Sequence, residues 1–168
     1  RLLLNSSSTL FPHGLANGSG MVGKHYMRHT TGSVFAEFSD PVHFYRGTIM
    51  AGLISDEVHF NPDRGFVGGY EMETVSLGPS FMAAFFNPGA WGRNFTSVMD
   101  NYTHLAAMWL VGEDMPRESN RITLSNSTKD RFGIPVANVH YDDHPNDIAM
   151  REHAFRQGSA VYEAVGAL

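Results

Sequence analysis

Short segments of alternating or continuous apolar residues predict strands along most of the chain. The segments predicted as strands are residues 34–38, 47–54, 69–77, 105–111, 120–125 and 135–141. Polar and apolar residues alternate in 34–38, in 120–125 and partly in 69–77, which is the period of a half-buried strand. Residues 105–111 are continuously apolar, and such a run suits a buried strand. Pro62 and Gly65 predict a turn at residues 61–65.

Helical spacing of apolar residues marks two further segments. Residues 91–102 predict a helix, because apolar side chains recur there every three or four positions. Asp143 is predicted to cap a long second helix. Its apolar face would carry Phe155, Gly158, Val161, Tyr162 and Val165. Because the strands do not alternate with helices, the pattern predicts an α+β fold with an antiparallel or mixed sheet of about five to six strands.

The ends of the pattern are less regular. Residues 1–8 predict the end of a helix, and residues 9–23, rich in Gly, Pro and Asn, predict a loop. Residues 80–86 are apolar and fit either a helix or a strand. They belong to an aromatic stretch that we interpret as core rather than pocket lining. Its members are Phe81, Phe85, Phe86, Trp91 and Phe95.

Composition narrows the class of protein. The chain has 168 residues, 42% of them apolar and 17% charged, which is typical of one folded domain or of a piece of a larger one. The net charge of −5, with 12 unclustered Lys and Arg residues, argues against a nucleic-acid binder. The absence of Cys excludes a disulfide, a thiolate zinc site and an iron–sulfur cluster within this sequence. No apolar run is long enough to predict a membrane-spanning helix.

Two sequence patterns suggest ligand sites, but their context favours simpler explanations. Residues 18–23 match G-x-G-x-x-G, yet no strand precedes them, so a flexible loop is the better interpretation. Two histidine pairs have the i, i+4 spacing of metal-binding helices, namely His25 with His29 and His140 with His144. Residues four apart in a strand are ~13 Å apart and cannot share a metal. Hydrogen-bonded loop histidines are therefore favoured.

Paired carboxylates form another candidate. Glu71 and Glu73 are two residues apart and would share one face of a strand. Such a pair can perform acid–base chemistry. Two glutamates on the solvent face of a sheet are the more common explanation.

Several segments, in this order and spacing, resemble the glucose–methanol–choline (GMC) family of FAD-dependent oxidoreductases. Residues 1–6 (RLLLNS) resemble the family's sp-x-LLL-x-S helix. Residues 21–29 (MVGKHYMRH) resemble its vG-x-N-L-x-D-H segment, with His25 in place of Asn and Arg28 in place of Asp. Residues 112–135 (from GEDMP to KDRFGIP) and 141–147 (YDDHPND) resemble the stretch before the last helix. The variants fit the bacterial sugar or gluconate dehydrogenase-like branch.

The resemblance implies a fragment from the middle of an enzyme. Residues 1–30 would end the FAD-binding domain, 31–143 would form the substrate-binding domain with helices on one face of its sheet, and 144–168 would form the long helix that leads toward the catalytic segment. The main FAD-binding motif is expected upstream of Arg1. The catalytic residues are expected downstream of Leu168, so the fragment alone is expected to be inactive.

The implied reaction is oxidation of a CH–OH group of an alcohol, sugar or polyol by hydride transfer to N5 of the flavin. The resemblance suggests Val22, Gly23, His25 and His29 as residues near the flavin. Glu71, Glu73, Phe81 and Trp91 are the candidates to face the substrate. A partner subunit that carries electrons is compatible with the resemblance, as is either the bacterial cytoplasm or the periplasm.

A different class of function stays open from the residues alone. The chain could be a stand-alone, non-catalytic binding module that holds a metal through His140 and His144, with Asp142 and Asp143 nearby. The sequence does not name the alcohol, the electron acceptor or the oligomeric state.

Overall fold

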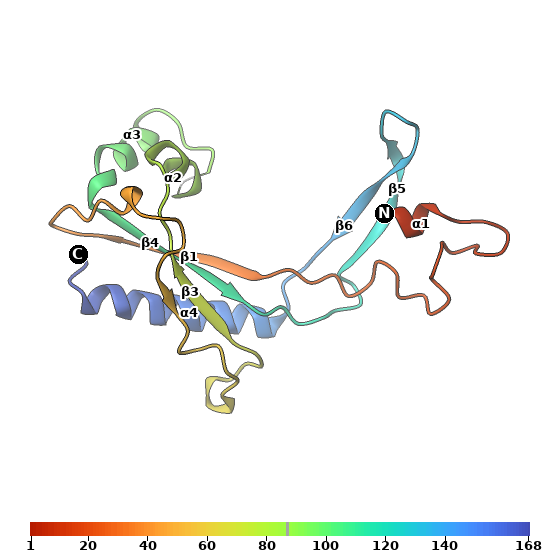
Figure 1. Ribbon diagram of the computed structural model, residues 1–168, viewed down its shortest axis with the longest axis horizontal. Helices are drawn as coiled ribbons and strands as arrows, with labels where there is room; N and C mark the ends of the chain where they lie inside the picture. The colour runs from red at the N-terminus through yellow and green to blue at the C-terminus, as the bar shows by residue number, and fades with distance from the viewer. Residues whose placement is uncertain (87) are drawn as a thin grey trace. The chain divides into compact units, whose positions relative to one another are not determined.

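The computed structural model describes residues 1–86 and 88–168, without the side chains of 85, 86 and 98. It divides the chain into two compact units. Unit 1 consists of Arg1–Arg28 and Asp114–Pro145, and unit 2 consists of His29–Glu113 and Asn146–Leu168. The described elements are helices and antiparallel strands, so the predicted α+β class is confirmed (Figure 1).

Unit 2 contains a four-stranded antiparallel sheet in the order β1-β4-β3-β2. The strands are β1 (Thr30–Glu37), β2 (Leu53–Ile54), β3 (Tyr70–Thr74) and β4 (Leu105–Gly112). The predicted strands at 34–38, 69–77 and 105–111 are confirmed, but β1 begins four residues earlier than expected. Of the predicted strand at 47–54, only Leu53 and Ile54 pair with a neighbouring strand.

The long helix α4 (Pro145–Ala164) runs along one face of this sheet (Figure 1). Its Met150 and Ala154 are buried against Met72, Met108 and Leu110 of the strands. These side chains lie on one face because alternate residues of a strand point to the same side. They form the core of unit 2.

The predicted apolar face of α4 is partly wrong. Gly158 is buried, and Val161 and Tyr162 pack against the core. Phe155 and Val165 are exposed, while Met150 and Ala154 take the central positions that the sequence did not suggest. The buried residues of α4 therefore lie nearer to the start of the helix than predicted, where the helix packs over β3 and β4. The helix begins at Pro145, so His144 rather than Asp143 precedes its first residue.

The remaining helices of unit 2 are short. They are η1 (Phe44–Arg46), η2 (Pro62–Arg64), α2 (Pro79–Phe86), α3 (Arg93–Asp100) and η3 (Tyr102–His104). The ambiguous segment 80–86 is therefore a helix, and the turn at 61–65 is confirmed, with Gly65 at φ 78°.

The interpretation of the aromatic stretch as core is wrong at two positions. Phe81 is 58% exposed and Trp91 is 84% exposed. Met82 and Ala83 are buried instead, since successive residues of α2 point in different directions around the helix axis. Phe95 is half-buried. The side chains of residues 85 and 86 lie outside the described part of the chain.

Unit 1 contains α1 (Leu2–Asn5) and a two-stranded antiparallel sheet of β5 (Arg121–Lys129) and β6 (Pro135–His140). The segment 9–23 consists of turns and irregular chain, so the loop prediction is confirmed there. The predicted strand at 120–125 is found as part of β5, which continues to Lys129 with an irregular register between Leu124 and Lys129. Among the described residues, no helix has the length and apolar character needed to cross a membrane.

Candidate functional site

The face of the four-stranded sheet away from α4 is formed by the alternate residues of the same strands. Ser33, Trp109 and Glu73 occupy one row across β1, β4 and β3, because Trp109 pairs with both of the others. All three are half-buried. We call this row and the neighbouring row of Thr31, Val111 and Glu71 the open face, in contrast to the α4 face. The row on the other side is closed, since its Ala107 is buried.

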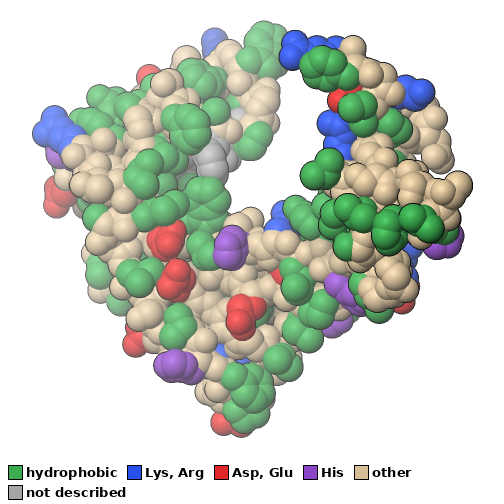
Figure 2. Space-filling model, turned by 45° about the vertical axis from the view of Figure 1, so that its right-hand side comes forward, with side chains coloured by type: hydrophobic (Ala, Val, Ile, Leu, Met, Phe, Trp, Pro, Cys, Tyr) green, Lys and Arg blue, Asp and Glu red, His purple; other side chains and the backbone are tan. Residues whose placement is uncertain are grey.

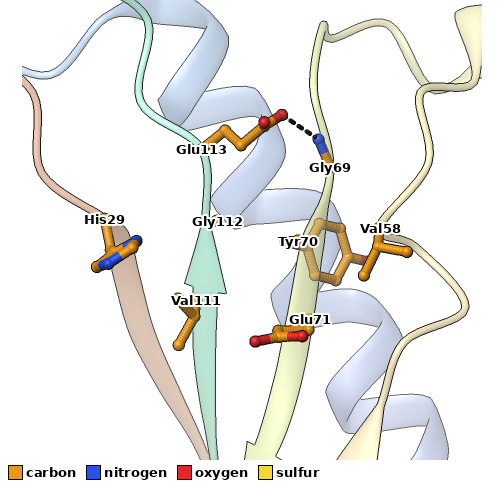
Figure 3. Close-up of a pocket in the computed structure, with 8 residues that line it drawn as sticks. All are labelled: His29, Val58, Gly69, Tyr70, Glu71, Val111, Gly112 and Glu113. Carbon is orange, nitrogen blue, oxygen red and sulfur yellow. Dashed lines mark hydrogen bonds between the residues drawn. The ribbon is translucent and has the colours of Figure 1, made fainter.

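The neighbouring row of the open face ends in a pocket of about 230 Å³. The pocket is lined by His29, Val58, Gly69, Tyr70, Glu71, Val111, Gly112 and Glu113 (Figure 3). The Glu113 carboxylate accepts a hydrogen bond of 3.0 Å from the Gly69 backbone N–H. In the space-filling view, acidic, histidine and hydrophobic side chains lie next to one another on the surface turned to the viewer (Figure 2).

The structure places Glu71 and Glu73 together on the open face, Glu71 within the pocket and Glu73 one row away. Both are half-buried. Within the described part of the chain, neither carboxylate has a hydrogen-bond or ion-pair partner. A partly desolvated carboxylate is stabilised by any donor that reaches it. The two glutamates are therefore suited to accept hydrogen bonds from ligand hydroxyl groups.

The strand that carries both glutamates is fixed from its other side by Tyr70 and His153. The Tyr70 hydroxyl and His153 Nδ1 are hydrogen-bonded at 2.8 Å. Burial raises the pKa of Tyr70 and lowers that of His153, so both groups are held neutral. Phe66 packs against the imidazole, with 5.3 Å between ring centroids.

The segment proposed to lie near the flavin is divided between the units. Val22, Gly23 and His25 belong to unit 1, whereas His29 belongs to unit 2 and lines the pocket. Phe81 and Trp91 do not line that pocket. The structure therefore brings together His29 and Glu71, and separately Val22 to His25.

Gly23 and His25 have unusual backbone conformations. Gly23 has a φ of 88°, and a Cβ there would lie 2.3 Å from the Ile122 carbonyl oxygen. Glycine is needed at this position because the segment approaches β5 closely; its carbonyl accepts a 2.6 Å hydrogen bond from Ile122 N–H. His25 also has a positive φ, of 53°. Its Nδ1 is buried and has no hydrogen-bond partner within the described residues.

Arg28, which stands where the family pattern has Asp, is held in a cluster of unit 1. Its guanidinium lies 4.1 Å from the centre of the Tyr141 ring and 3.3 Å from Asp143 Oδ1. Its backbone N–H donates to Asp114 Oδ2 at 2.7 Å, and the Tyr141 hydroxyl donates to the same oxygen at 2.9 Å. Asp143 thus takes part in an ion pair with Arg28, and its predicted role as the cap of the long helix stays a prediction.

The histidines proposed as metal ligands show other contacts. His140 Nε2 lies 3.1 Å from Asp142 Oδ2, and both side chains are exposed. In the described ranges, no group of three or more His, Asp or Glu side chains is placed to hold a metal ion. A metal-binding module therefore gains no support from the geometry.

The sequence did not suggest Ser33, Trp109 or Glu113 as members of a site. The period-two pattern shows which residues of one strand share a face, but not which strand lies beside it. β1 and β4 are separated by more than sixty residues. Their pairing is fixed by long-range contacts that no local motif encodes.

Comparison with known proteins relates the whole chain to dehydrogenases. It is 35% identical over 177 aligned positions to 2-methyl-1,2-propanediol dehydrogenase of Mycolicibacterium austroafricanum, an alignment that covers 100% of the chain and 31% of that protein. The chain is a homologue of dehydrogenases. No family model matches it.

Two further relatives have similar names. The fructose dehydrogenase large subunit of Gluconobacter japonicus is 27% identical, with 84% of the chain and 26% of the relative covered. The gluconate 2-dehydrogenase flavoprotein of Pantoea cypripedii is 24% identical, with 92% of the chain and 27% of the relative covered. The chain thus spans less than a third of the curated relatives it matches, and its resemblance to the sugar and gluconate dehydrogenase-like branch is confirmed.

Proposed function

We propose that the chain is part of an FAD-dependent dehydrogenase of GMC type that oxidises a CH–OH group of an alcohol, sugar or polyol. The observation that carries this proposal is the 35% identity to 2-methyl-1,2-propanediol dehydrogenase along the whole chain. The name of one further relative includes the word flavoprotein, which supports a flavin. The assignment of residues 1–30, 31–143 and 144–168 to an FAD-domain end, a substrate domain and a connecting helix stays a prediction.

The named substrates of the relatives support a polyhydroxylated substrate. The diol has hydroxyl groups on neighbouring carbon atoms, and fructose and gluconate carry several hydroxyl groups. A hydroxyl group that is not oxidised still needs a hydrogen-bond acceptor when it leaves water. Glu71 and Glu73 supply such acceptors on the open face.

The residues of unit 1 fit a polar edge of a cofactor. The buried His25 Nδ1 has no partner among the described groups, and a buried polar atom of this kind is stabilised by a ligand that hydrogen-bonds to it. Val22, Gly23 and His25 are the residues that would hold the flavin here. When bound, FAD supplies the acceptor for the hydride. His29, the fourth residue proposed to lie near the flavin, belongs to unit 2 and lines the pocket there.

A partner subunit that receives the electrons is also part of the proposal. The relative from Gluconobacter japonicus is named as a large subunit, which supports an assembly of this kind.

The experiment uses the full-length protein that contains this chain. We expect the purified protein to show flavin absorbance that is bleached anaerobically by a diol or polyol, and to reduce a redox dye with the same substrate. His25→Ala is expected to lower the flavin content. The matched control His140→Ala changes an exposed histidine of the same unit and is expected to leave the flavin content unchanged. A full-length protein without bound flavin would contradict the proposal.

A further inference from the structure

We propose that Ser33, Trp109 and Glu73 form a recognition row for the hydroxyl group next to the one that is oxidised. The row would make the enzyme select vicinal diols and polyols over alcohols with a single hydroxyl group. This inference rests on the proposed function and adds to it the residues that choose the substrate.

The geometry of the row follows from the strand register. Trp109 of β4 is paired with Ser33 of β1 on one side and with Glu73 of β3 on the other. Directly paired residues of antiparallel strands have Cβ atoms roughly 4.5–5.5 Å apart, so Ser33 and Glu73 each lie beside Trp109 and can reach a molecule that rests on its ring. Their neighbours Val34, Met108 and Met72 point to the α4 face, where a Cβ on Gly158 would touch Val34 and Met72.

The chemistry of the row matches a carbon chain with several hydroxyl groups. Glu73 accepts hydrogen bonds, and Ser33 can donate as well as accept. Trp109 offers a wide apolar surface between them, suited to the C–H groups of a sugar or polyol. Leu53 of β2 is paired with Glu73 and extends the apolar surface at the sheet edge.

The neighbouring row differs in the residue at its centre. There, Thr31 and Glu71 flank Val111. The carboxylate is retained, but the flat aromatic surface is replaced by a small aliphatic one. We therefore assign the selection of substrate to the row that contains the tryptophan.

The test compares two substrates on the same preparation of the full-length enzyme. The kcat/KM for 1,2-propanediol is divided by that for 1-propanol, a ratio that is independent of the flavin content. We expect the wild type to favour the diol. Glu73→Gln keeps the shape of the side chain but removes its charge, and should lower the ratio roughly tenfold through the diol alone.

Two other variants complete the test. Ser33→Ala, a change that removes one hydroxyl group, should lower the ratio in the same direction and by less. Glu152→Gln makes the same chemical change on exposed α4 surface and should leave the ratio as in the wild type. The thermal unfolding midpoint of each variant is measured to show whether it is folded. If Glu73→Gln is unfolded, the substrate ratio of Ser33→Ala decides whether the row selects the diol.

The outcomes separate the two proposals. If the full-length wild type holds no flavin and oxidises none of these compounds, the proposed function fails and the row has no substrate to select. If the wild type oxidises alcohols but the ratio is unchanged by Glu73→Gln and Ser33→Ala, only the role of the row is overturned.

Discussion

The two faces of the four-stranded sheet are made by alternate residues of the same strands, and they differ in burial and in residue type. On the α4 face, Met72, Met108 and Leu110 are buried against a helix. On the open face, Glu73 and Trp109 are only half-buried. Neighbouring residues of one strand therefore differ in burial: one belongs to the core, and the next is accessible to a ligand.

This difference in burial means that the open face can change its chemistry without loss of the fold. A side chain on the open face can be replaced with little effect on the core, because its Cβ points away from α4. A buried side chain on the α4 face, such as Leu110, is closely packed and cannot change its volume freely. The comparison predicts separable effects for residues that are adjacent in sequence.

The largest expected effect is at Leu110, which is 2% exposed. Leu110→Ala should destabilise the protein by about 3 kcal/mol, because it removes buried methyl groups and leaves a cavity. The adjacent change Val111→Ala on the open face should cost about 1 kcal/mol or less. Thermal unfolding midpoints of the full-length protein measure both. Equal losses at the two positions would show that the faces do not differ as described.

A smaller effect is expected at the closest contact between α4 and the sheet. A Cβ at Gly158 would lie 2.9 Å from Val34 Cγ2, which is too close without movement of the helix. Gly158→Ala should therefore destabilise by about 1 kcal/mol, with overpacking outweighing the gain in helix propensity. Ser159→Ala, one residue later and exposed, provides the control and should be neutral or slightly stabilising. If Gly158→Ala raised the thermal midpoint, α4 would not pack as closely as the structure shows.

The hydrogen bond between Tyr70 of β3 and His153 of α4 links the sheet to the helix. Its contribution to the free energy of unfolding should be comparable to the effect of Gly158→Ala or slightly smaller. Tyr70→Phe removes the hydroxyl and leaves the half-buried imidazole without this partner, at a cost of about 1 kcal/mol. Tyr45→Phe removes a hydroxyl whose distance to His43 Nδ1 is longer, 3.3 Å, and should cost less. The order of the two midpoints is the measured quantity, and the reverse order would contradict the assignment.

The sequence predicted the elements better than their assembly. The strands at residues 105–111 and 34–38 could be predicted because burial leaves a local pattern of apolar residues. The predicted buried face of α4 differed from the observed one, because the central positions of Met150 and Ala154 depend on the sheet that they contact. The exposed Phe81 and Trp91 show that an aromatic side chain does not by itself define a core.

The candidate site depends both on the spacing of residues within one strand and on the pairing between strands. Glu71 and Glu73 could be proposed from their spacing alone, since residues two apart in a strand share a face. Ser33 and Trp109 could not, because they join Glu73 only through pairing between β1, β4 and β3. The positive φ of His25 and its buried, unpartnered Nδ1 are likewise consequences of the tertiary structure.

The smallest expected effect is the change in folding stability with pH that His153 of α4 contributes. Burial lowers the pKa of His153 below its ordinary value of 6.5. The charge of Glu57 raises this pKa, and the charges of Arg64 and Arg156 lower it, so the net shift is downward. Between the folded and unfolded pKa values the unfolded chain binds more protons, so stability should fall as the pH drops below about 6.5. His153→Gln keeps a hydrogen-bonding group beside Tyr70 but does not titrate there. The thermal midpoint of this variant should fall less than that of the wild type between about pH 7.5 and pH 5.5, and parallel falls would mean that His153 is not held neutral by the α4 face.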